Sequence, residues 1–374
     1  MSRTSILAIS DVHIGCPRLN PFLLHERFNK FLYPQITKDI SILFICGDFF
    51  DSLINLSNPS SREAMAIIKE LKSLCRSVGC DLRVLRGTFS HDRDQPLHFI
   101  HREDPNDNTV RMFDKISFEY HEKTGLNIIY IPDNHGSKDI YKDISDLLVA
   151  HNVEKADILI HHGYFIHMFP PGVKPDKDAL NVDLIQKYVK GCVLNGHVHR
   201  SSIFKNVISI GSFDRLAHDE DGPKGFYRID IDGDQYKFNF IENKEANKFI
   251  TIDLLGFGED HESAVKYFCD EWSKLTSTFI EGHIVHVRVK TDDKTINDAC
   301  RTAAREIWKW TVVDAAKTIK RDQVLENVNT CLDELPVITP GNIETLLMPI
   351  IERRSHKISP EDLHQIITTV AEAK

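Results

Sequence analysis

Two histidines stand two residues apart in LNGHVHR, residues 194 to 200, directly behind a short apolar run. Side chains alternate between the two faces of a strand, so His197 and His199 point the same way only if the chain stays extended past the glycine. Two imidazoles aimed at one point would suit a shared metal ion. The alternative is a pair of solvated loop histidines, and this motif alone does not decide between them.

Similar polar clusters follow four other apolar runs that read as strands. In chain order they are Asp11-Val12-His13, Gly47-Asp48 with Asp51, Ser90-His91-Asp92 behind Gly87-Thr88-Phe89, and His161-His162-Gly163. In open α/β sheets, ligands bind outside the carboxyl ends of the strands. Each cluster alone is a weak signal, but five in this order predict one shared site.

The mixture of carboxylates and imidazoles indicates hydrolysis of phosphate esters by two metal ions. A carboxylate that bridges two divalent cations holds them about 3.5–4 Å apart, as in two-metal phosphoesterases. Imidazole and carboxylate donors together accept manganese, iron or zinc and leave positions open for water and phosphate. A histidine outside the coordination shell can protonate the leaving oxygen.

The elements that must position these residues are strands alternating with helices over residues 1 to 245. The expected strands are Ile6–Ser10, Ile42–Cys46, Leu82–Arg86, Asn127–Ile131, Ile158–Ile160, Cys192–Leu194 and Val207–Ile210, with a helix over Ser61–Leu74. Short continuous apolar runs are typical of strands buried on both faces. The region closes with Tyr227–Ile241, where DIDGD predicts a hairpin turn rather than a calcium loop.

Two further units are expected after this first one. Residues 246–322 contain FITIDL, a helix over 259–275, the strand HIVHVRVK and a helix over Thr295–Trp310, which together predict a small α/β capping domain. Residues 323–374 begin with a polar linker and end in two amphipathic helices. The second helix has Ser359 as N-cap and Pro360 at its first position. Partner binding and packing on the chain itself are both open for this pair.

Bulk composition is that of a soluble globular protein of two or three domains. The 374 residues are 41% apolar and 27% charged, and no apolar run approaches the roughly 20 residues that span a bilayer. The eight cysteines show no CxxC pair, which suits reduced thiols, and the start has no secretory signal, so we expect a cytoplasmic protein. The net charge of −9 gives no global attraction to nucleic acid, although a local basic groove or bound metals can still hold phosphates.

The order DxH, GDxxD, a GNH[DE]-like segment, a ligand histidine after a strand and GHxH resembles the calcineurin-like metallophosphoesterases. That resemblance implies a layered β-sandwich flanked by helices and two divalent metal ions. It implies that Asp11, His13, Asp48 and His199 hold one metal, that Asp48, His162 and His197 hold the other, and that His91 is the general acid. His162 is preferred to His161 because DILIHHG aligns with the family's stretch.

This chain departs from the family pattern at Gly87-Thr88-Phe89-Ser90-His91. The family has Gly-Asn-His there, and the asparagine is a ligand of the second metal. Ser90, next to His91, is expected to offer a hydroxyl or backbone oxygen in its place, with a bound water as the alternative. Asp51 and Asp92 are expected to orient histidines from outside the ligand set, Asp92 as part of the catalytic pair with His91, and His161 to support the neighbouring ligand.

A narrower resemblance follows GHVHR. Ile208-Ser209-Ile210-Gly211-Ser212 and the segment Asp219–Phe226, with its acidic residues, Lys224 and Gly225, are similar to the SbcD-type nucleases. This implies a Mn²⁺-dependent nuclease, with Mg²⁺ and Fe²⁺ as alternatives, that cuts duplex ends exonucleolytically and single strands or hairpins endonucleolytically. It also implies DNA as substrate, a homodimer, an SbcC-type SMC-like ATPase bound by the C-terminal helices, and the cytoplasm of a bacterial or phage-infected cell.

Two other functions remain open at this stage. One is a small-molecule phosphodiesterase or nucleotide phosphatase of the same fold, which would not need about 130 residues beyond the core. The other is a non-catalytic scaffold that binds DNA ends or the ATPase. Arg18, Arg93, Arg200 and Arg215 flank the motifs and are candidates for phosphate contacts, the alternative being plain surface charge.

Overall fold

The computed structural model of the chain describes residues 3–55, 57–99, 108–133, 135–170, 172–258, 260–279 and 284–314. Its first sheet has the order β12-β11-β1-β2-β3-β4. The strands are β1 (Thr4–Ile9), β2 (Ile40–Cys46), β3 (Asp81–Leu85), β4 (Val110–Phe113), β11 (Gly225–Asp232) and β12 (Gln235–Glu242). Strands β1 to β4 are parallel, and β11 runs antiparallel to β1.

The second sheet has the order β5-β6-β7-β8-β10-β9. Its strands are β5 (Ser117–His121), β6 (Leu126–Ile131), β7 (Ala156–His162), β8 (Val189–Gly196), β9 (Ser202–Phe204) and β10 (Val207–Ser209). The central strands β6, β7, β8 and β10 are parallel, and antiparallel strands form both edges.

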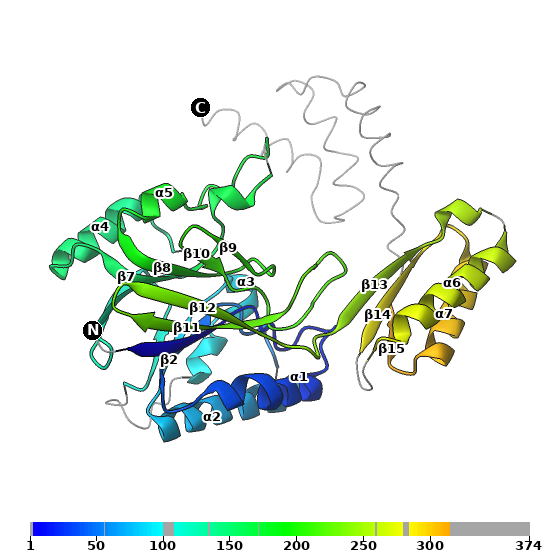
Figure 1. Cartoon of the computed structure of the whole chain (residues 1–374), viewed down its shortest axis with the longest axis horizontal. Helices are drawn as coiled ribbons and strands as arrows, with labels where there is room; N and C mark the ends of the chain where they lie inside the picture. The colour runs from blue at the N-terminus through cyan, green and yellow to red at the C-terminus, as the bar shows by residue number, and fades with distance from the viewer. Residues whose placement is uncertain are drawn as a thin grey trace, which may run out of the picture. The chain divides into compact units, whose positions relative to one another are not determined.

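Helices cover the outer faces of both sheets (Figure 1). Helices α1 (Pro21–Arg27), continued by a π-helical turn over Phe28–Leu32, and α2 (Pro59–Val78) lie on the first sheet. Helices α4 (Ile140–Ala150) and α5 (Val182–Ile185) lie on the second. Short helical turns complete this part: Tyr33–Gln35, α3 (Phe89–Asp92), Gln95–Phe99 and Ile166–Met168.

The alternation of side chains along each strand separates three hydrophobic cores. In β1, Leu7 and Ile9 face α1 and α2, whereas Ile6 and Ala8 face the second sheet. The second sheet contributes Ile128 and Ile158 to the same inner core, and Ile129 and Leu159 to a third core with α4 and α5. Because both faces of the central strands are buried, their sequences are continuous apolar runs rather than alternating ones. The layered α/β sandwich predicted from the sequence is therefore confirmed.

The predicted strands and the long helix are found at the expected places, with ends shifted by a few residues. The hairpin over Tyr227–Ile241 is also confirmed, because β11 and β12 pair across a turn that contains Gly233. Strands β4, β5 and β9 were missed. They are short, and β9 is exposed along its whole length, so the sequence there has no apolar run.

A third, smaller sheet follows residue 247 and has its own core. It consists of the parallel strands β13 (Lys248–Asp253), β14 (Val285–Lys290) and β15 (Thr311–Val313), with the turn Leu255–Phe257 and the helices α6 (His261–Thr276) and α7 (Lys294–Ile307). Phe268 and Trp272 of α6 lie in its hydrophobic core. The helix predicted to reach Trp310 ends earlier, because residues 311–313 form β15.

The predicted domain limits 1–245, 246–322 and 323–374 stay a prediction. The two predicted C-terminal helices and their linker lie outside the described residues. No described helix combines the length and apolar character that crossing a bilayer requires.

Candidate metal centre

The carboxyl ends of five parallel strands, β1 to β3 of one sheet and β7 and β8 of the other, bring the polar clusters together. Three groups of side chains each place their ligand atoms within 4.8 Å of one another. The groups are Asp11 with His13 and His199, His13 with Asp48 and His91, and Asp48 with His162 and His197. The shared members join the three groups into one centre.

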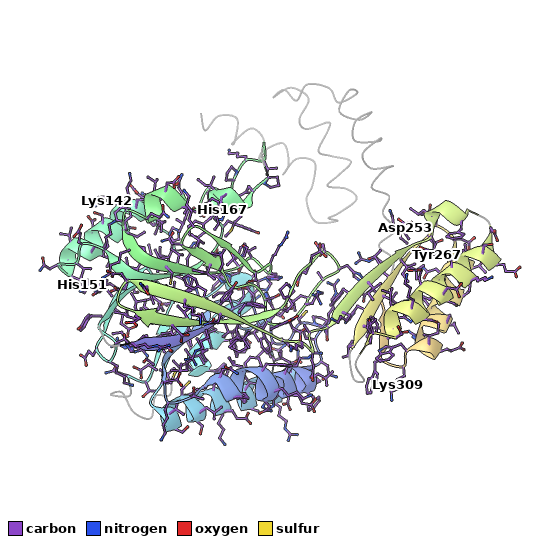
Figure 2. The ribbon with its side chains drawn as sticks, in the orientation of Figure 1. Lys142, His151, His167, Asp253, Tyr267 and Lys309 are labelled. Carbon is purple, nitrogen blue, oxygen red and sulfur yellow. The ribbon has the colours of Figure 1, made fainter. Side chains whose placement is uncertain are left out.

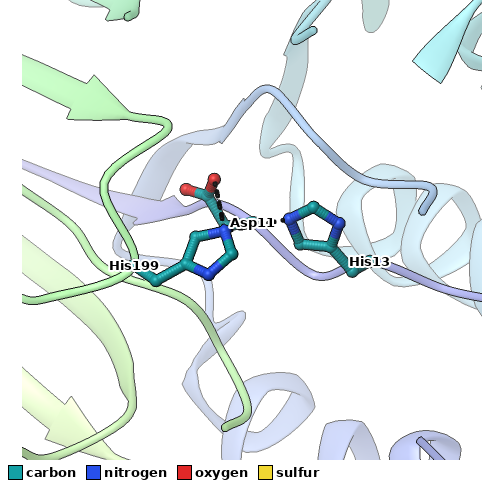
Figure 3. Close-up of side chains that lie close together, drawn as sticks. All are labelled: Asp11, His13 and His199. Atoms are coloured by element: carbon teal, nitrogen blue, oxygen red, sulfur yellow. Dashed lines mark hydrogen bonds and ion pairs between the residues drawn. The ribbon is translucent and has the colours of Figure 1, made fainter. Parts of the chain in front are cut away.

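The first group points its side chains toward one spot (Figure 3). The Nε2 atoms of His13 and His199 are 3.1 Å apart, and the His199 Nε2 lies 3.7 Å from a carboxylate oxygen of Asp11. Asp11 and His13 are buried, while His199 is partly exposed. The opening of this group toward solvent is thus on the side of His199.

Asp48 lies between the first and second groups. Its Oδ2 is 3.3 Å from the Nε2 of His162 and 3.8 Å from the Nε2 of His13. His197 completes the second group, and its backbone N–H donates to both oxygens of Asp11 at 3.0 and 3.1 Å. One carboxylate therefore faces imidazoles from both sheets, as a bridging ligand would.

Glycines let these loops approach one another. A Cβ on Gly47 would lie 2.2 Å from the Nδ1 of His162, and a Cβ on Gly87 would lie 2.1 Å from the backbone nitrogen of Asp48. Such contacts are far inside van der Waals distance, so a side chain at either position would push the loops apart. The glycine in the GD motif and the one that opens GTFSHD are thus explained by packing at the centre.

Four candidate ligands have left-handed backbone conformations. The φ angles are +50° for Asp11, +52° for His13, +48° for Asp48 and +80° for His197. Aspartate and histidine tolerate this region better than most residues, but it remains uncommon outside glycine. Backbone strain of this kind clusters at functional sites, where the surrounding structure imposes it.

The second ring nitrogens of three histidines are engaged away from the centre. Nδ1 donates from His162 to the carbonyl of Cys46 at 2.8 Å, from His199 to Glu220 at 2.8 Å, and from His91 to the carbonyl of Asp51. This fixes the tautomer, so Nε2 of each neutral ring carries a lone pair toward the centre. Metal-binding histidines are held in this way, and the donor set therefore fits divalent cations.

The charges at the centre also favour a cation. Burial alone would lower the pKa of His162, but the carboxylate of Asp48 raises that pKa to about 10. Burial would likewise raise the pKa of Asp48, and His162 instead holds it well below its ordinary value. A positive charge is thus stabilised between these two side chains. His161, by contrast, bonds the amide oxygen of Asn195 at 2.6 Å, and burial lowers its pKa to about 3.

The structure brings His162, rather than His161, into the candidate ligand groups. The His161 ring lies beside Gly163 and lines a pocket of about 130 Å³ next to His162 and His197. The Oδ1 of Asp51 lies 3.2 Å from the Nδ1 of His13, an ion-pair contact without hydrogen-bond alignment, so its role in orienting a histidine stays a prediction.

Ser90 is not where the ligand prediction needs it. It is exposed on the short helix α3, and within the described part of the chain no hydrogen bond links it to the centre. Thr88 lies there instead. Its N–H donates to Asp48 at 2.6 Å, and its hydroxyl is 3.3 Å from Asp48, 3.5 Å from His162 and 3.4 Å from His197. Thr88 directly follows Gly87, and the asparagine of the family pattern likewise directly follows its glycine.

Asp92 does not orient His91, contrary to the prediction. Its carboxylate is fully buried and accepts hydrogen bonds from the N–H groups of Gly87, Asp48 and Phe50 at 2.7, 3.1 and 3.0 Å. Burial, with Asp48 adding to it, raises the pKa of Asp92 to about 6. Asp92 therefore ties the loop after β3 to the loop after β2, which sets the position of Asp48.

Glu220 and Lys224 were not predicted as part of the centre. Glu220 accepts from His199 at 2.8 Å and from the buried ammonium of Lys224 at 2.7 Å. Lys224 also donates to the carbonyl of His199 at 2.8 Å. Although burial would raise it, the pKa of Glu220 is lowered to about 2 by His199 and Lys224. The acidic-lysine-glycine segment was noticed in the sequence, but only as a mark of resemblance.

The four arginines that flank the motifs differ in their surroundings. Arg18 donates to the carbonyl of Leu216, and Arg215 donates to the carbonyls of Glu220, Gly222 and Asn247. These two hold loops together and are poor candidates for phosphate contacts. Arg93 and Arg200 are exposed and remain candidates.

No protein-family model matches the chain. It is 27% identical over 259 residues to the DNA double-strand break repair protein Mre11 of Sulfurisphaera tokodaii. The match covers 63% of this chain and 61% of that protein, so it spans about three fifths of the relative's length. It supports the broader prediction of a calcineurin-like metallophosphoesterase and does not distinguish the SbcD type.

Two solved structures show weaker similarity. GAP50, the anchor in the inner membrane complex of Plasmodium, is 13% identical with a TM-score of 0.38, covering 66% of this chain and 86% of that one. A second structure is 14% identical with a TM-score of 0.35, covering 64% of this chain and all of the other. Scores this low carry no argument about function.

Proposed function

We propose that the chain is a divalent-metal-dependent DNA nuclease that hydrolyses phosphodiester bonds. It would act as an exonuclease on duplex ends and as an endonuclease on single strands and hairpins. The observation that carries the proposal is the carboxylate of Asp48 between two sets of imidazoles, with His91 in contact range of the same centre. The similarity to a DNA double-strand break repair protein supports DNA as the substrate.

In this proposal two ions, most simply Mn²⁺, are held by the groups described above. Asp11, His13, Asp48 and His199 would hold one ion, and Asp48, His162 and His197, with the hydroxyl of Thr88, would hold the other. Such ions activate a bound water and neutralise charge on the phosphoryl oxygens.

His91 supplies the proton for the leaving oxygen. Its Nδ1–H donates to the carbonyl of Asp51, so Nε2 is the nitrogen that faces the centre. A protonated imidazole in that orientation donates from Nε2. The ring of His13 lies against it edge to face, with centroids 4.9 Å apart, and limits its rotation.

We further propose that the chain is the nuclease subunit of an SbcCD-like complex in DNA repair and recombination. The predicted helices near the C-terminus would bind an SbcC-type ATPase, and the chain would form a homodimer. The order of units along the sequence and the relative's role in double-strand break repair support this.

The test is digestion of linear duplex DNA with added Mn²⁺, beside hydrolysis of a chromogenic phosphodiester. His91→Ala should lose DNA cleavage while still binding Mn²⁺, and the exposed His98→Ala is the matched control. Turnover of the small ester without DNA cleavage, even with the ATPase partner added, would support the small-molecule phosphodiesterase instead. Metal binding without any turnover would support the scaffold.

A further inference from the structure

Aromatic side chains border the candidate metal centre on the side of His197. The ring of Tyr164 meets the ring of His197 edge to face, with centroids 4.4 Å apart at 89°. The ring of Phe169 also packs against Tyr164, with centroids 5.1 Å apart. Tyr164 is 38% exposed, so its ring is open to solvent while it contacts a candidate ligand.

A second aromatic pair joins the same loop to the edge strand β9. His167 stacks on Phe204 with centroids 4.2 Å apart and planes 19° from parallel (His167 is labelled in Figure 2). Phe204 is 42% exposed, and the ammonium of Lys205 lies 5.7 Å from its ring centre. Burial lowers the pKa of His167, which favours the uncharged ring. We call these two ring pairs, Tyr164 with Phe169 and His167 with Phe204, the aromatic platform.

The charges around the platform decide what it can receive. Asp133, Asp176 and Asp178 line the pocket that Tyr164 and His197 also line. Beside Tyr164 these carboxylates favour an uncharged group over a phosphate, whereas a phosphate is expected only at the metal ions that His162 and His197 would hold. Nucleobases are uncharged and present a flat π face, which stacks on aromatic rings whatever the base sequence.

We propose that the aromatic platform stacks the unpaired bases of single-stranded DNA beside the phosphodiester bond that the metal centre holds. This rests on the proposed nuclease function and deepens it by naming the substrate form. In a duplex the base faces are stacked on one another and unavailable. The platform therefore selects single strands and frayed ends, because only these offer free faces next to His197.

The test measures binding without cleavage, by fluorescence anisotropy of a short labelled oligothymidylate in EDTA. Tyr164→Ala and Phe204→Ala should each weaken binding about tenfold, or about 1.4 kcal/mol, because each removes a ring on which one base stacks. Tyr164→Phe keeps the ring and should keep the parental affinity. Tyr120→Ala is the matched control, because Tyr120 is 58% exposed on β5 and contacts none of the platform rings in the described structure.

A second measurement needs no variant. An oligonucleotide with 2-aminopurine as its unpaired end base should lose fluorescence on binding the parent protein, because stacking quenches this base. An unchanged signal, or alanine variants that bind the oligothymidylate as tightly as the parent, would overturn the platform. Equal losses of single-strand and duplex binding in the alanine variants would also overturn it. Concentration-dependent dimerisation that both alanine variants abolish, with DNA binding unchanged, would overturn it too and would assign the rings to contact with a second copy of the chain.

Failure of this inference is distinguishable from failure of the proposed function. If the parent cleaves duplex DNA with Mn²⁺ but binds single strands without any contribution from the platform rings, only the inference is wrong. If the parent hydrolyses neither DNA nor the chromogenic diester, the nuclease proposal is wrong, whatever the platform binds.

Discussion

Replacing Glu220 by glutamine isolates the contact that orients His199. The change keeps the size of the side chain and removes its negative charge. In the parent, Glu220 accepts from His199, from the backbone N–H of Leu216 at 3.1 Å and from the ammonium of Lys224. All three partners are hydrogen-bond donors. The NH₂ group of glutamine is also a donor, so at least one of the three partners would lose its acceptor.

Two effects of this change can be sized from the structure. Loss of a group that orients a metal-binding histidine weakens metal affinity about 10- to 100-fold. Lys224 is 2% exposed and would retain only neutral acceptors, the carbonyl of His199 and the hydroxyl of Ser212 at 2.8 and 2.9 Å. Breaking a buried ion pair from one side costs about 3–5 kcal/mol of unfolding free energy, and the two neutral acceptors make this an upper bound.

The assay is calorimetric titration of Mn²⁺, with urea unfolding in EDTA for stability. Lys224→Met separates the two effects, because it should destabilise the fold while the contact between Glu220 and His199, and hence the metal affinity, is kept. Asp219→Asn is the neighbouring exposed control and should change neither quantity. The reasoning is refuted if folded Glu220→Gln binds Mn²⁺ as tightly as the parent.

Three further predictions concern the loops and the scaffold. Thr88→Val should lower the affinity for the more weakly bound Mn²⁺, because it removes the hydroxyl near Asp48 and His162. Ser90→Ala should leave that affinity unchanged. Equal effects of the two changes in a calorimetric Mn²⁺ titration would support Ser90 as the ligand. Asp92→Ala leaves three buried N–H groups without acceptors and should lower the urea-unfolding free energy by about 3 kcal/mol or more, at roughly 1–3 kcal/mol per group; a loss below about 1 kcal/mol would contradict this. His25 lies 2.8 Å from both Glu63 and Glu70, which raise its pKa despite burial. The stabilisation of the fold by protonated His25 is therefore present at pH 6 and is lost as the pH rises through the raised pKa. The difference in unfolding free energy between the parent and His25→Gln should be larger at pH 6 than at pH 9, and a constant difference would refute this.

Much of the fold could be predicted because the strands are buried on both faces. Runs such as Ile42–Cys46 supply one core with every other residue and a second core with the rest, and this leaves a continuous apolar signal. Strand β9 carries no such signal, because all three of its residues are exposed although it pairs with β10. Local patterns do not encode edge strands of this kind.

The sequence motifs were sufficient to predict which strand ends meet at the candidate site. The clusters at the strand ends converge as expected, because parallel strands deliver their carboxyl ends to one edge. Thr88 was missed because the two extra residues before His91 drew attention to Ser90. Thr88 is the residue that directly follows Gly87, and its backbone N–H donates to Asp48. The role of Asp92 was misjudged because its acceptors are used by backbone N–H groups, which no side-chain pattern reveals.

The left-handed backbone at Asp11, His13, Asp48 and His197 has a consequence for engineering the protein. Glycine would occupy each of these positions at a lower conformational cost than the residue found there, by roughly 1 kcal/mol, the low end of the range for residues other than glycine. Thermostability selection on a library at these four sites should therefore favour glycine at His13 and His197. At Asp11 and Asp48 it should not, because glycine would leave the N–H groups of His197 and Thr88 without their acceptors. A screen for heat resistance alone would therefore select variants that lack metal ligands. Metal-dependent turnover must be part of any selection.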